Sequence, residues 1–211
     1  MSSKSDILKA VRAHLIEAVD LPDLNEPGIE YPDSEAQFIE VLTGVGGSCL
    51  KAASREQASA ELAKIPAYAE AKKIVSLVPG VGLPNVDLEV IADPHELEDI
   101  DFAVLPGQFA VAENGAIWVT DAGIKHRVIY FLPQHLALVV PAEQILHNMH
   151  QAYDWLAEHQ RADGSPHFGT TGFGVFISGP SKTADIEQSL VIGAHGARSL
   201  TVILLARDGE T

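Results

Sequence analysis

The chain alternates between short apolar runs and stretches in which apolar residues recur every three or four positions. Uninterrupted apolar runs predict buried strands, and the wider spacing predicts amphipathic helices. The predicted helices occupy 4–19, 35–43, 54–64, 142–159 and 184–193. The predicted strands occupy 73–78, 102–105, both arms of 109–120, 127–132, 136–140, 173–178 and 199–205. Strands and helices therefore follow one another along most of the chain.

The order of these elements indicates the fold class. The strand at 173–178, the helix at 184–193 and the strand at 199–205 would form a right-handed crossover that joins parallel neighbours. Asn114 and Gly115 stand between two apolar runs and predict a type I′ hairpin, which adds antiparallel strands. We therefore expect an α/β fold with a mixed, largely parallel open sheet and flanking helices.

The first part of the chain has a different character. Segment 20–33 contains three prolines and many acidic residues, so it predicts a linker or an arm laid across a neighbour. Its apolar side chains favour the docked arm. Ser34 can cap the helix that follows, and Gly44 would end that helix. We expect an N-terminal helical arm and linker over 1–44 and an α/β domain over 45–211.

Composition limits the classes of function. With 46% hydrophobic residues among 211, the chain can build a substantial core. Its formal charge of −15 argues against binding to nucleic acid or to anionic membranes, because both need a basic surface. No apolar run is long enough to cross a bilayer, and the start lacks the apolar segment of a signal peptide. We expect a cytoplasmic protein with no nucleic-acid or membrane partner.

Cysteine and histidine residues give little support to a metal site. Cys49 is the only cysteine, so an internal disulfide and a four-cysteine iron–sulfur or zinc site are both impossible in this chain. We expect Cys49 to be a buried thiol, because no local base accompanies it. His147 and His150 have the spacing of a metal pair on a helix, but His147 lies opposite the apolar face. A solvated surface is the favoured interpretation of both histidines.

The stretch 177–196, ISGPSKTADIEQSLVIGAHG, holds most of the candidate chemistry. The preceding strand would deliver it to the carboxyl edge of the sheet, where open α/β folds bind ligands. Gly179 permits a tight turn, and the start of the predicted helix offers unpaired N–H groups. With the hydroxyls of Ser178, Ser181 and Thr183, these groups can hold a carboxylate or a phosphate. The alternative is that the same residues only cap the helix.

Three ionisable residues in this stretch suit acid–base chemistry. Asp185 and Glu187 would repel a bound phosphate, and they suit contacts to hydroxyls, amines or Mg²⁺, or proton transfer. His195 follows the predicted helix, with Gly196 behind it. A histidine in that place either caps the helix or acts in catalysis, and capping is the commoner role.

These residues together resemble a known family. The resemblance rests on small residues, acids and a terminal His-Gly pair within one stretch: Ser178-Gly179-Pro180-Ser181, Thr183-Ala184-Asp185-Ile186-Glu187, Gly193 and His195-Gly196. The set resembles the LUD domain and, more closely, the lactate-utilization protein C (YkgG) family, over 109–205. One family pattern reads Gly-Pro-Arg after the histidine, whereas this chain has Ala197 in place of the proline. Arg198 stays available there as a ligand-binding residue.

The resemblance implies a NagB/RpiA/CoA-transferase-like fold. It also implies a place in a three-protein system that oxidises L-lactate to pyruvate with iron–sulfur partners. With Cys49 alone, this chain would be the cluster-free subunit, with no cofactor of its own and the iron–sulfur clusters in its partners. It would bind a small acid or cofactor fragment around 178–198.

The predicted hairpin carries a further likeness to the family. Ala112-Glu113-Asn114-Gly115 resembles the family's Ala-Glu-x-Gly hairpin, and enzymes of the related CoA-transferase fold use a glutamate in chemistry. Glu113 is therefore a candidate carboxylate base or ligand group. The alternative is an exposed residue beside a turn.

Three functions stay open at this point. The leading hypothesis is a subunit of a lactate-oxidising assembly that binds a small molecule around 178–198. The second is an independent enzyme of acyl or CoA transfer, or a cyclo-ligase, that uses Glu113 or Glu187. The third is a noncatalytic scaffold that docks its partners through the arm at 20–33.

Overall fold

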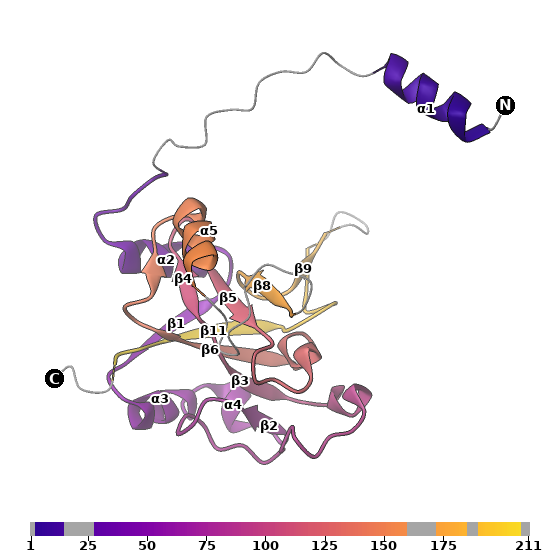
Figure 1. The fold of residues 1–211 in the computed structure, drawn as a ribbon. Helices are drawn as coiled ribbons and strands as arrows, with labels where there is room; N and C mark the ends of the chain where they lie inside the picture. Colours follow the sequence, from indigo (N-terminus) through magenta and orange to yellow (C-terminus); the bar gives the residue numbers. More distant parts are fainter. Residues whose placement is uncertain (1–2, 15–27, 160–171, 185–189, 208–211) are drawn as a thin grey trace.

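The computed structural model describes residues 3–14, 28–159, 172–184 and 190–207 (Figure 1). Its helices are α1 (Ser3–Ala13), α2 (Ser34–Gly44), α3 (Arg55–Leu62), α4 (Pro66–Ala69) and α5 (Met149–Glu158), with short 3₁₀ turns η1 (Pro94–Leu97) and η2 (Arg127–Tyr130). No helix in these ranges is both long and apolar enough to cross a membrane.

Within the described ranges, five parallel strands make the central sheet, in the order β1-β11-β6-β3-β2. They are β1 (Ser48–Ala52), β11 (Ser199–Leu205), β6 (His135–Pro141), β3 (Phe102–Pro106) and β2 (Ile74–Ser76). The expected α/β fold with a largely parallel sheet and flanking helices is confirmed.

The hairpin strands lie in a second, mixed sheet, which in the described part of the chain has four strands in the order β7-β4-β5-β8. These four strands are β7 (Ile145–Leu146), β4 (Phe109–Val111), β5 (Ala116–Thr120) and β8 (Gly174–Ile177). Strand β5 is antiparallel to both β4 and β8, whereas β7 is parallel to β4. The predicted hairpin at 109–120 is thus confirmed, with Gly115 at φ +65° in its turn.

Strand β6 shows how the two sheets pack. Leu136, Leu138 and Val140 belong to the core shared with the four-stranded sheet. Ala137 and Val139 point the other way, into a second core shared with α3 and α4. Because side chains alternate along a strand, both faces of β6 are buried and its sequence is apolar throughout.

Helix α5 covers the outer face of the four-stranded sheet. Phe109 and Trp118 on that face form a third buried cluster with Ala152 and Leu156 of α5. The molecule is therefore layered as α3 and α4, the five-stranded sheet, the four-stranded sheet, and α5 (Figure 1).

The start of the α/β region departs from the pattern in two details. The helix at 35–43 is confirmed, but Asp33 caps it rather than Ser34, because the Asp33 carboxylate accepts the N–H of Ala36 at 2.9 Å. Strand β1 carries exposed Ser48 and Lys51 at the edge of the sheet. Because β1 contains both polar and apolar residues, the apolar runs of the sequence did not predict it.

Two predicted elements are replaced by shorter ones. The run 127–132 is not a strand but contains η2, which buries Ile129 and Tyr130, and Tyr130 donates its hydroxyl to the Thr120 carbonyl at 3.0 Å. The predicted helix at 142–159 begins only at α5, because β7 pairs with β4 before Asn148 caps α5.

The predicted crossover is wrong, and the described ends of the helix expected at 184–193 are not helical. Lys182–Thr183 forms strand β9 and Val191–Ile192 forms strand β10, and the two pair as an antiparallel ribbon. Strands β8 and β11 lie in different sheets, so they are not parallel neighbours. Each strand of the ribbon has only two residues. Such short strands show no periodic spacing of apolar residues that would distinguish them from a helix.

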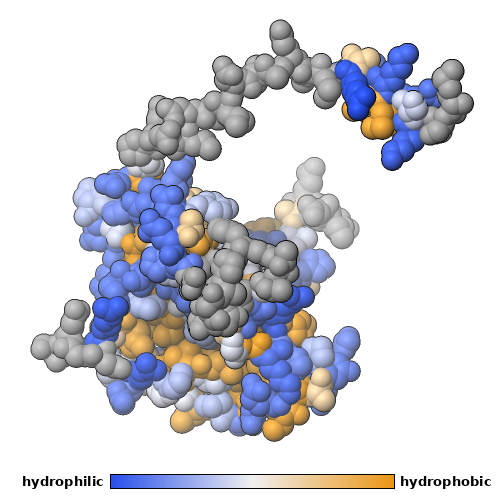
Figure 2. Space-filling model, in the orientation of Figure 1, coloured by the Kyte–Doolittle hydropathy of each residue, from blue (hydrophilic) through white to orange (hydrophobic). Residues whose placement is uncertain are grey.

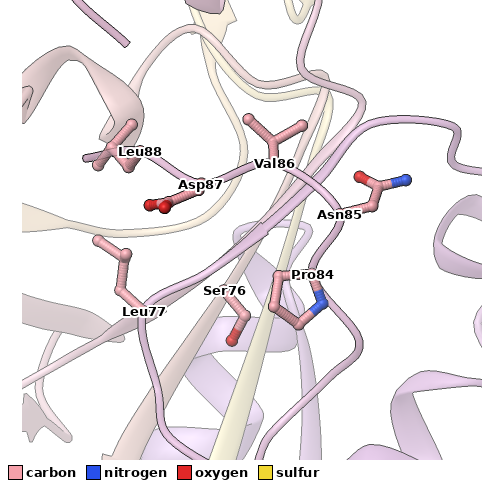
Figure 3. A pocket seen from close by; sticks show the side chains of 7 residues that line it. All are labelled: Ser76, Leu77, Pro84, Asn85, Val86, Asp87 and Leu88. Carbon is pink, nitrogen blue, oxygen red and sulfur yellow. The ribbon is translucent and has the colours of Figure 1, made fainter. Parts of the chain in front are cut away.

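A loop covers the free edge of β2. The N–H groups of Asn85 and Val86 both donate to the carbonyl of Ile74, at 3.0 and 3.1 Å. A hollow of about 380 Å³ lies between this loop and the end of β2, and among the described residues that line it Asp87 alone is ionisable (Figure 3). Asp87 accepts the N–H of Glu89 at 2.9 Å, so its carboxylate serves the loop.

The N-terminal arm is described in two pieces. Helix α1 has no buried residue and exposes Ile7, Leu8 and Val11 (Figure 2). Near α5, Asn148 donates its side-chain amide to the carbonyl of Ile29 at 2.8 Å, so this part of the arm is docked. The intervening residues 15–27 lie outside the described ranges.

The histidine pair at the start of α5 behaves differently from the expectation. His147 accepts the N–H of Tyr31 at 3.0 Å, and its ring stacks on the Tyr31 ring. His147 is therefore half-buried under the arm, whereas His150 is exposed as predicted. The solvated-surface interpretation is wrong for His147.

We predict that Leu138→Ala lowers the free energy of unfolding by about 2–5 kcal/mol, because it leaves a cavity between the two sheets. Leu83→Ala is the matched control, since 80% of Leu83 is exposed, and it should change stability by less than about 0.5 kcal/mol. Urea unfolding measures both. Equal stability of the two variants would show that this interface is not closely packed.

Candidate functional site

The stretch 178–198 leaves the four-stranded sheet at the end of β8 and returns to the central sheet at β11. Gly179 makes the first turn with φ +70°, and a Cβ there would lie 2.6 Å from the carbonyl oxygen of Val45. Only glycine fits both the left-handed backbone and this close approach. The turn therefore depends on Gly179, as the sequence predicted.

Backbone hydrogen bonds then bring the two arms of the stretch together. The N–H of Ser181 donates to the carbonyl of Ala197, and the N–H of Gly193 donates to the carbonyl of Ser181, both at 2.9 Å. Ser181 also packs against Gly196, where a Cβ would lie 3.1 Å from the Ser181 Cβ. Residues far apart in the stretch thus become neighbours.

A pocket of about 240 Å³ lies between these arms. One water molecule needs only about 10–15 Å³ by this kind of measure, so the corner is not filled by side chains. The pocket is lined by five of the predicted site residues, namely Ser178, Gly179, Ser181, His195 and Gly196. The structure brings these five together, although the described residues of the helix expected between them, 184 and 190–193, are not helical.

The pocket lies at the opposite edge of the sheet from the one expected. Leu136 and Leu200 line it, and each is the second residue of its strand, β6 and β11. The pocket is therefore at the amino ends of the central strands. The expectation of the carboxyl edge is wrong because β8 belongs to the other sheet. Lys182–Thr183, just before the expected helix start, is a strand, and the first turn of that helix lies largely outside the described residues.

Apolar walls and a few polar groups define the chemistry of the pocket. Phe131 and Leu136 contribute to the walls, and the Ser181 side chain is half-buried. The Ser178 hydroxyl donates to the carbonyl of Asn114 at 2.8 Å, which ties this strand end to the hairpin. His195 is exposed at the pocket. The site can accept a small molecule with one polar end.

Tyr130 adds a neutral hydroxyl behind these walls. Burial raises the pKa of Tyr130 above its usual value, with a smaller contribution from Asp121, so the phenol stays protonated at neutral pH. The sequence pattern does not identify Tyr130 and Phe131 as pocket residues, because it predicts a strand where η2 forms. An aromatic pair just before Pro133 is the only signal the sequence offers.

The other predicted site residues lie elsewhere or are not described. Arg198 is exposed and packs over Gly193, where a Cβ would lie 2.3 Å from the Arg198 Cγ. Thr183 lies on β9, outside the pocket lining. Asp185 and Glu187 lie outside the described residues.

Glu113 is exposed and has a structural contact. Its Oε2 accepts the N–H of Met149 at 2.8 Å, at the first residue of α5. A carboxylate in this place satisfies a free amide and the positive end of the helix dipole. Glu113 does not line the pocket at 178–197.

Cys49 is a half-buried free thiol. Burial, and next the charge of Glu35, raise the pKa of the Cys49 thiol to about 11. The protonated thiol is a poor nucleophile. Over the described ranges, no three residues of the His, Cys, Asp and Glu types come together as a metal site would need.

This architecture defines an α/β protein with a parallel sheet stacked on a smaller mixed sheet. Residues 69–205 match the sequence profile of the LUD domain, so the chain belongs to the LUD domain family. The family expected from the 178–196 stretch is thereby confirmed.

Several curated relatives carry the name lactate utilization protein C. The protein from Bacillus pumilus is 30% identical over 112 residues, which cover 51% of this chain and 43% of the relative. The protein from Shouchella clausii is 33% identical over 108 residues, covering 48% of this chain and 42% of the relative. The chain thus spans less than half the length of these relatives.

A solved structure shares the fold. The crystal structure of a DUF162 family protein from Deinococcus radiodurans superposes with a TM-score of 0.59 at 18% identity. The alignment covers 82% of this chain and 96% of the Deinococcus chain. At this identity the likeness concerns the fold.

We predict that Gly179→Ala destabilises the protein by about 1–3 kcal/mol, because alanine is strained at φ +70° and meets the Val45 carbonyl. Gly44→Ala is the control, since a Cβ there meets nothing within 4 Å, and it should be neutral or stabilising by up to about 1 kcal/mol. Thermal unfolding compares them. A Gly179→Ala protein as stable as the control would exclude this role for the turn.

Proposed function

We propose that the chain is a subunit of a lactate-utilization system and binds a small carboxylic acid in the pocket at 178–197. The observation that carries the proposal is the convergence of Ser178, Gly179, Ser181, His195 and Gly196 on one pocket. The names of the LUD-domain relatives support the same system.

The size and lining of the pocket suit a small acid. At about 240 Å³ it is smaller than the roughly 300–1,000 Å³ typical of sites for drug-sized ligands. Apolar walls can enclose the methyl end of lactate or pyruvate, and the Ser181 hydroxyl can donate to the carboxylate. His195 supplies a ring N–H at the pocket that can donate a hydrogen bond to the acid. Ser181 and His195 are therefore the proposed ligand-binding residues.

The redox step is proposed for partner proteins. Oxidation of lactate to pyruvate removes two electrons and two protons, and the electrons need an acceptor. Cys49 alone cannot ligate a four-cysteine cluster. We therefore assign the iron–sulfur clusters to partner subunits, while this chain holds the acid or product near them.

The position of Glu113 weighs against an independent transferase. Its carboxylate is bonded to the first amide of α5 and does not line the pocket. A base in acyl or CoA transfer must reach the reacting atom within hydrogen-bond distance. The lactate-utilization proposal needs no such contact, because it relies on Ser181 and His195 at the pocket.

We predict that the purified chain binds L-lactate or pyruvate, and that Ser181→Ala and His195→Ala each weaken binding about tenfold, equivalent to ~1.4 kcal/mol. Isothermal titration calorimetry measures the affinities. His150→Ala is the matched control, because His150 is exposed on α5 and does not line the pocket, and it should bind like the unchanged protein. Unchanged affinity in both pocket variants would refute the assignment of the site.

The system itself is tested in cells. Deletion of the gene should abolish growth on L-lactate but not on glucose, and the His150→Ala gene should restore growth where the His195→Ala gene restores it poorly. The tagged chain should capture proteins with iron–sulfur absorbance from lactate-grown cells. Normal growth of the deletion strain on L-lactate would refute the proposed function.

A further inference from the structure

A separate cavity of about 530 Å³ lies at the carboxyl edge of the central sheet. It is lined by residues at or just beyond the carboxyl ends of all five parallel strands. Arg55 follows β1, Val78 follows β2, Gly107 follows β3, Pro141 ends β6 and Arg207 follows β11. Open parallel sheets bind their ligands at this edge. The pocket at 178–197 is at the other edge, so the two are distinct.

The described residues that line this cavity carry a net charge opposite to that of the chain. Among the described residues that line it, Arg55, Arg207 and Glu143 are charged and sum to +1, whereas the whole chain carries −15. Two guanidinium groups therefore gather at one cavity of a strongly acidic protein. Arginine presents planar sets of N–H donors that match carboxylate and phosphate oxygens. The lining favours an anion.

Arg55 is held in place by the loop after β2. Its Nη1 donates to the carbonyl of Pro79 at 2.6 Å. Gly80, at φ +76°, packs on the Arg55 side chain, where a Cβ would lie 3.4 Å from the Arg55 Cδ. Arg55 is also the first residue of α3, where the partial positive charge of the helix adds to its own.

Arg207 is held more loosely. Its Nε lies 2.8 Å from the Oε1 of Glu143, and 72% of the Arg207 side chain is exposed. An exposed ion pair contributes little to stability. The Arg207 guanidinium can therefore turn from Glu143 to a bound dianion at little cost. A phosphoryl group carries a charge of about −1.5 to −2 at neutral pH, so it attracts the Arg207 guanidinium more strongly than a singly charged carboxylate does.

Apolar residues line the remainder of the cavity. Val78, Val139 and Leu205 lie beside Pro106 and Pro141. In the view of Figure 2, apolar residues gather over the lower half of the molecule. They extend to the left side, where the chain ends in Figure 1. The volume falls within the roughly 300–1,000 Å³ of sites for drug-sized ligands and far exceeds the need of a three-carbon acid.

We propose that this cavity binds a phosphorylated small molecule of nucleotide size. The phosphoryl group lies between Arg55 and Arg207, and the apolar part of the ligand packs on Val78, Val139 and Leu205. Neither the family relationship nor the pocket at 178–197 assigns such a ligand. The cavity alone supports this ligand, so the proposal does not depend on lactate binding at the other pocket.

The test uses AMP and inorganic pyrophosphate as probes, with adenosine as the probe that lacks phosphate. Calorimetry should show binding of AMP and none of adenosine. Arg55→Gln and Arg207→Gln should each weaken AMP binding by about tenfold or more, and Arg55→Lys should recover part of the loss, because it keeps the charge but not the planar donor set. Circular dichroism checks that each variant is folded.

Two control variants test whether AMP binds at this cavity. Lys64→Gln removes the same charge from an exposed residue just after α3, outside the cavity lining, and should leave AMP binding unchanged. Ser181→Ala should also leave it unchanged, because Ser181 lines the other pocket. The proposal is wrong if neither AMP nor pyrophosphate binds at millimolar concentration, if adenosine binds as tightly as AMP, or if the arginine variants bind like Lys64→Gln.

Discussion

The packing of the four-stranded sheet onto the five-stranded sheet is the constraint on which the rest of the structure depends. It buries one face of β6, β3 and β11, while α3 and α4 bury the other face. When both faces of a parallel sheet are covered, a ligand can reach the sheet only at the ends of its strands. Both of the cavities interpreted as binding sites lie at those ends, one at each edge of the sheet.

The same packing explains which elements could be predicted from the sequence. Strands β3, β6 and β11 are buried on both faces, so each one is a nearly continuous apolar run. The hairpin was predictable because Asn114-Gly115 has a local turn preference that tertiary contacts do not override. Helices α2 and α3 were marked by the spacing of their apolar residues, although Asp33 and not the predicted Ser34 caps α2.

The elements that could not be predicted are those fixed by distant partners. The two-residue strands β7, β9 and β10 exist only through pairing, and two residues carry no period. Val191 and Ile192 are apolar yet exposed, so their hydropathy indicates neither a buried helix nor a buried strand. The run 127–132 has the apolar character of a strand, but η2 within it packs as a short turn.

The sequence predicted five residues of the candidate site correctly but placed the site at the wrong edge of the sheet. Turn residues such as Gly179 and Ser181 indicate a loop locally, and that loop forms a pocket with His195. The edge at which the site lies depends on which sheet β8 joins, and no local sequence signal indicates that sheet. The arginine-lined cavity was missed because Arg55 and Arg207 are distant in sequence and meet only through the adjacent strands β1 and β11.

The most direct test of the central claim is a titration of the ¹⁵N-labelled chain with L-lactate, followed by amide chemical shifts. The account predicts that the largest shifts fall on the amides of Ser178, Gly179, Ser181 and residues 195–197 at the amino edge of the central sheet. Shifts confined to residues beyond the carboxyl ends of β6 and β11, or no shifts at all, would contradict it.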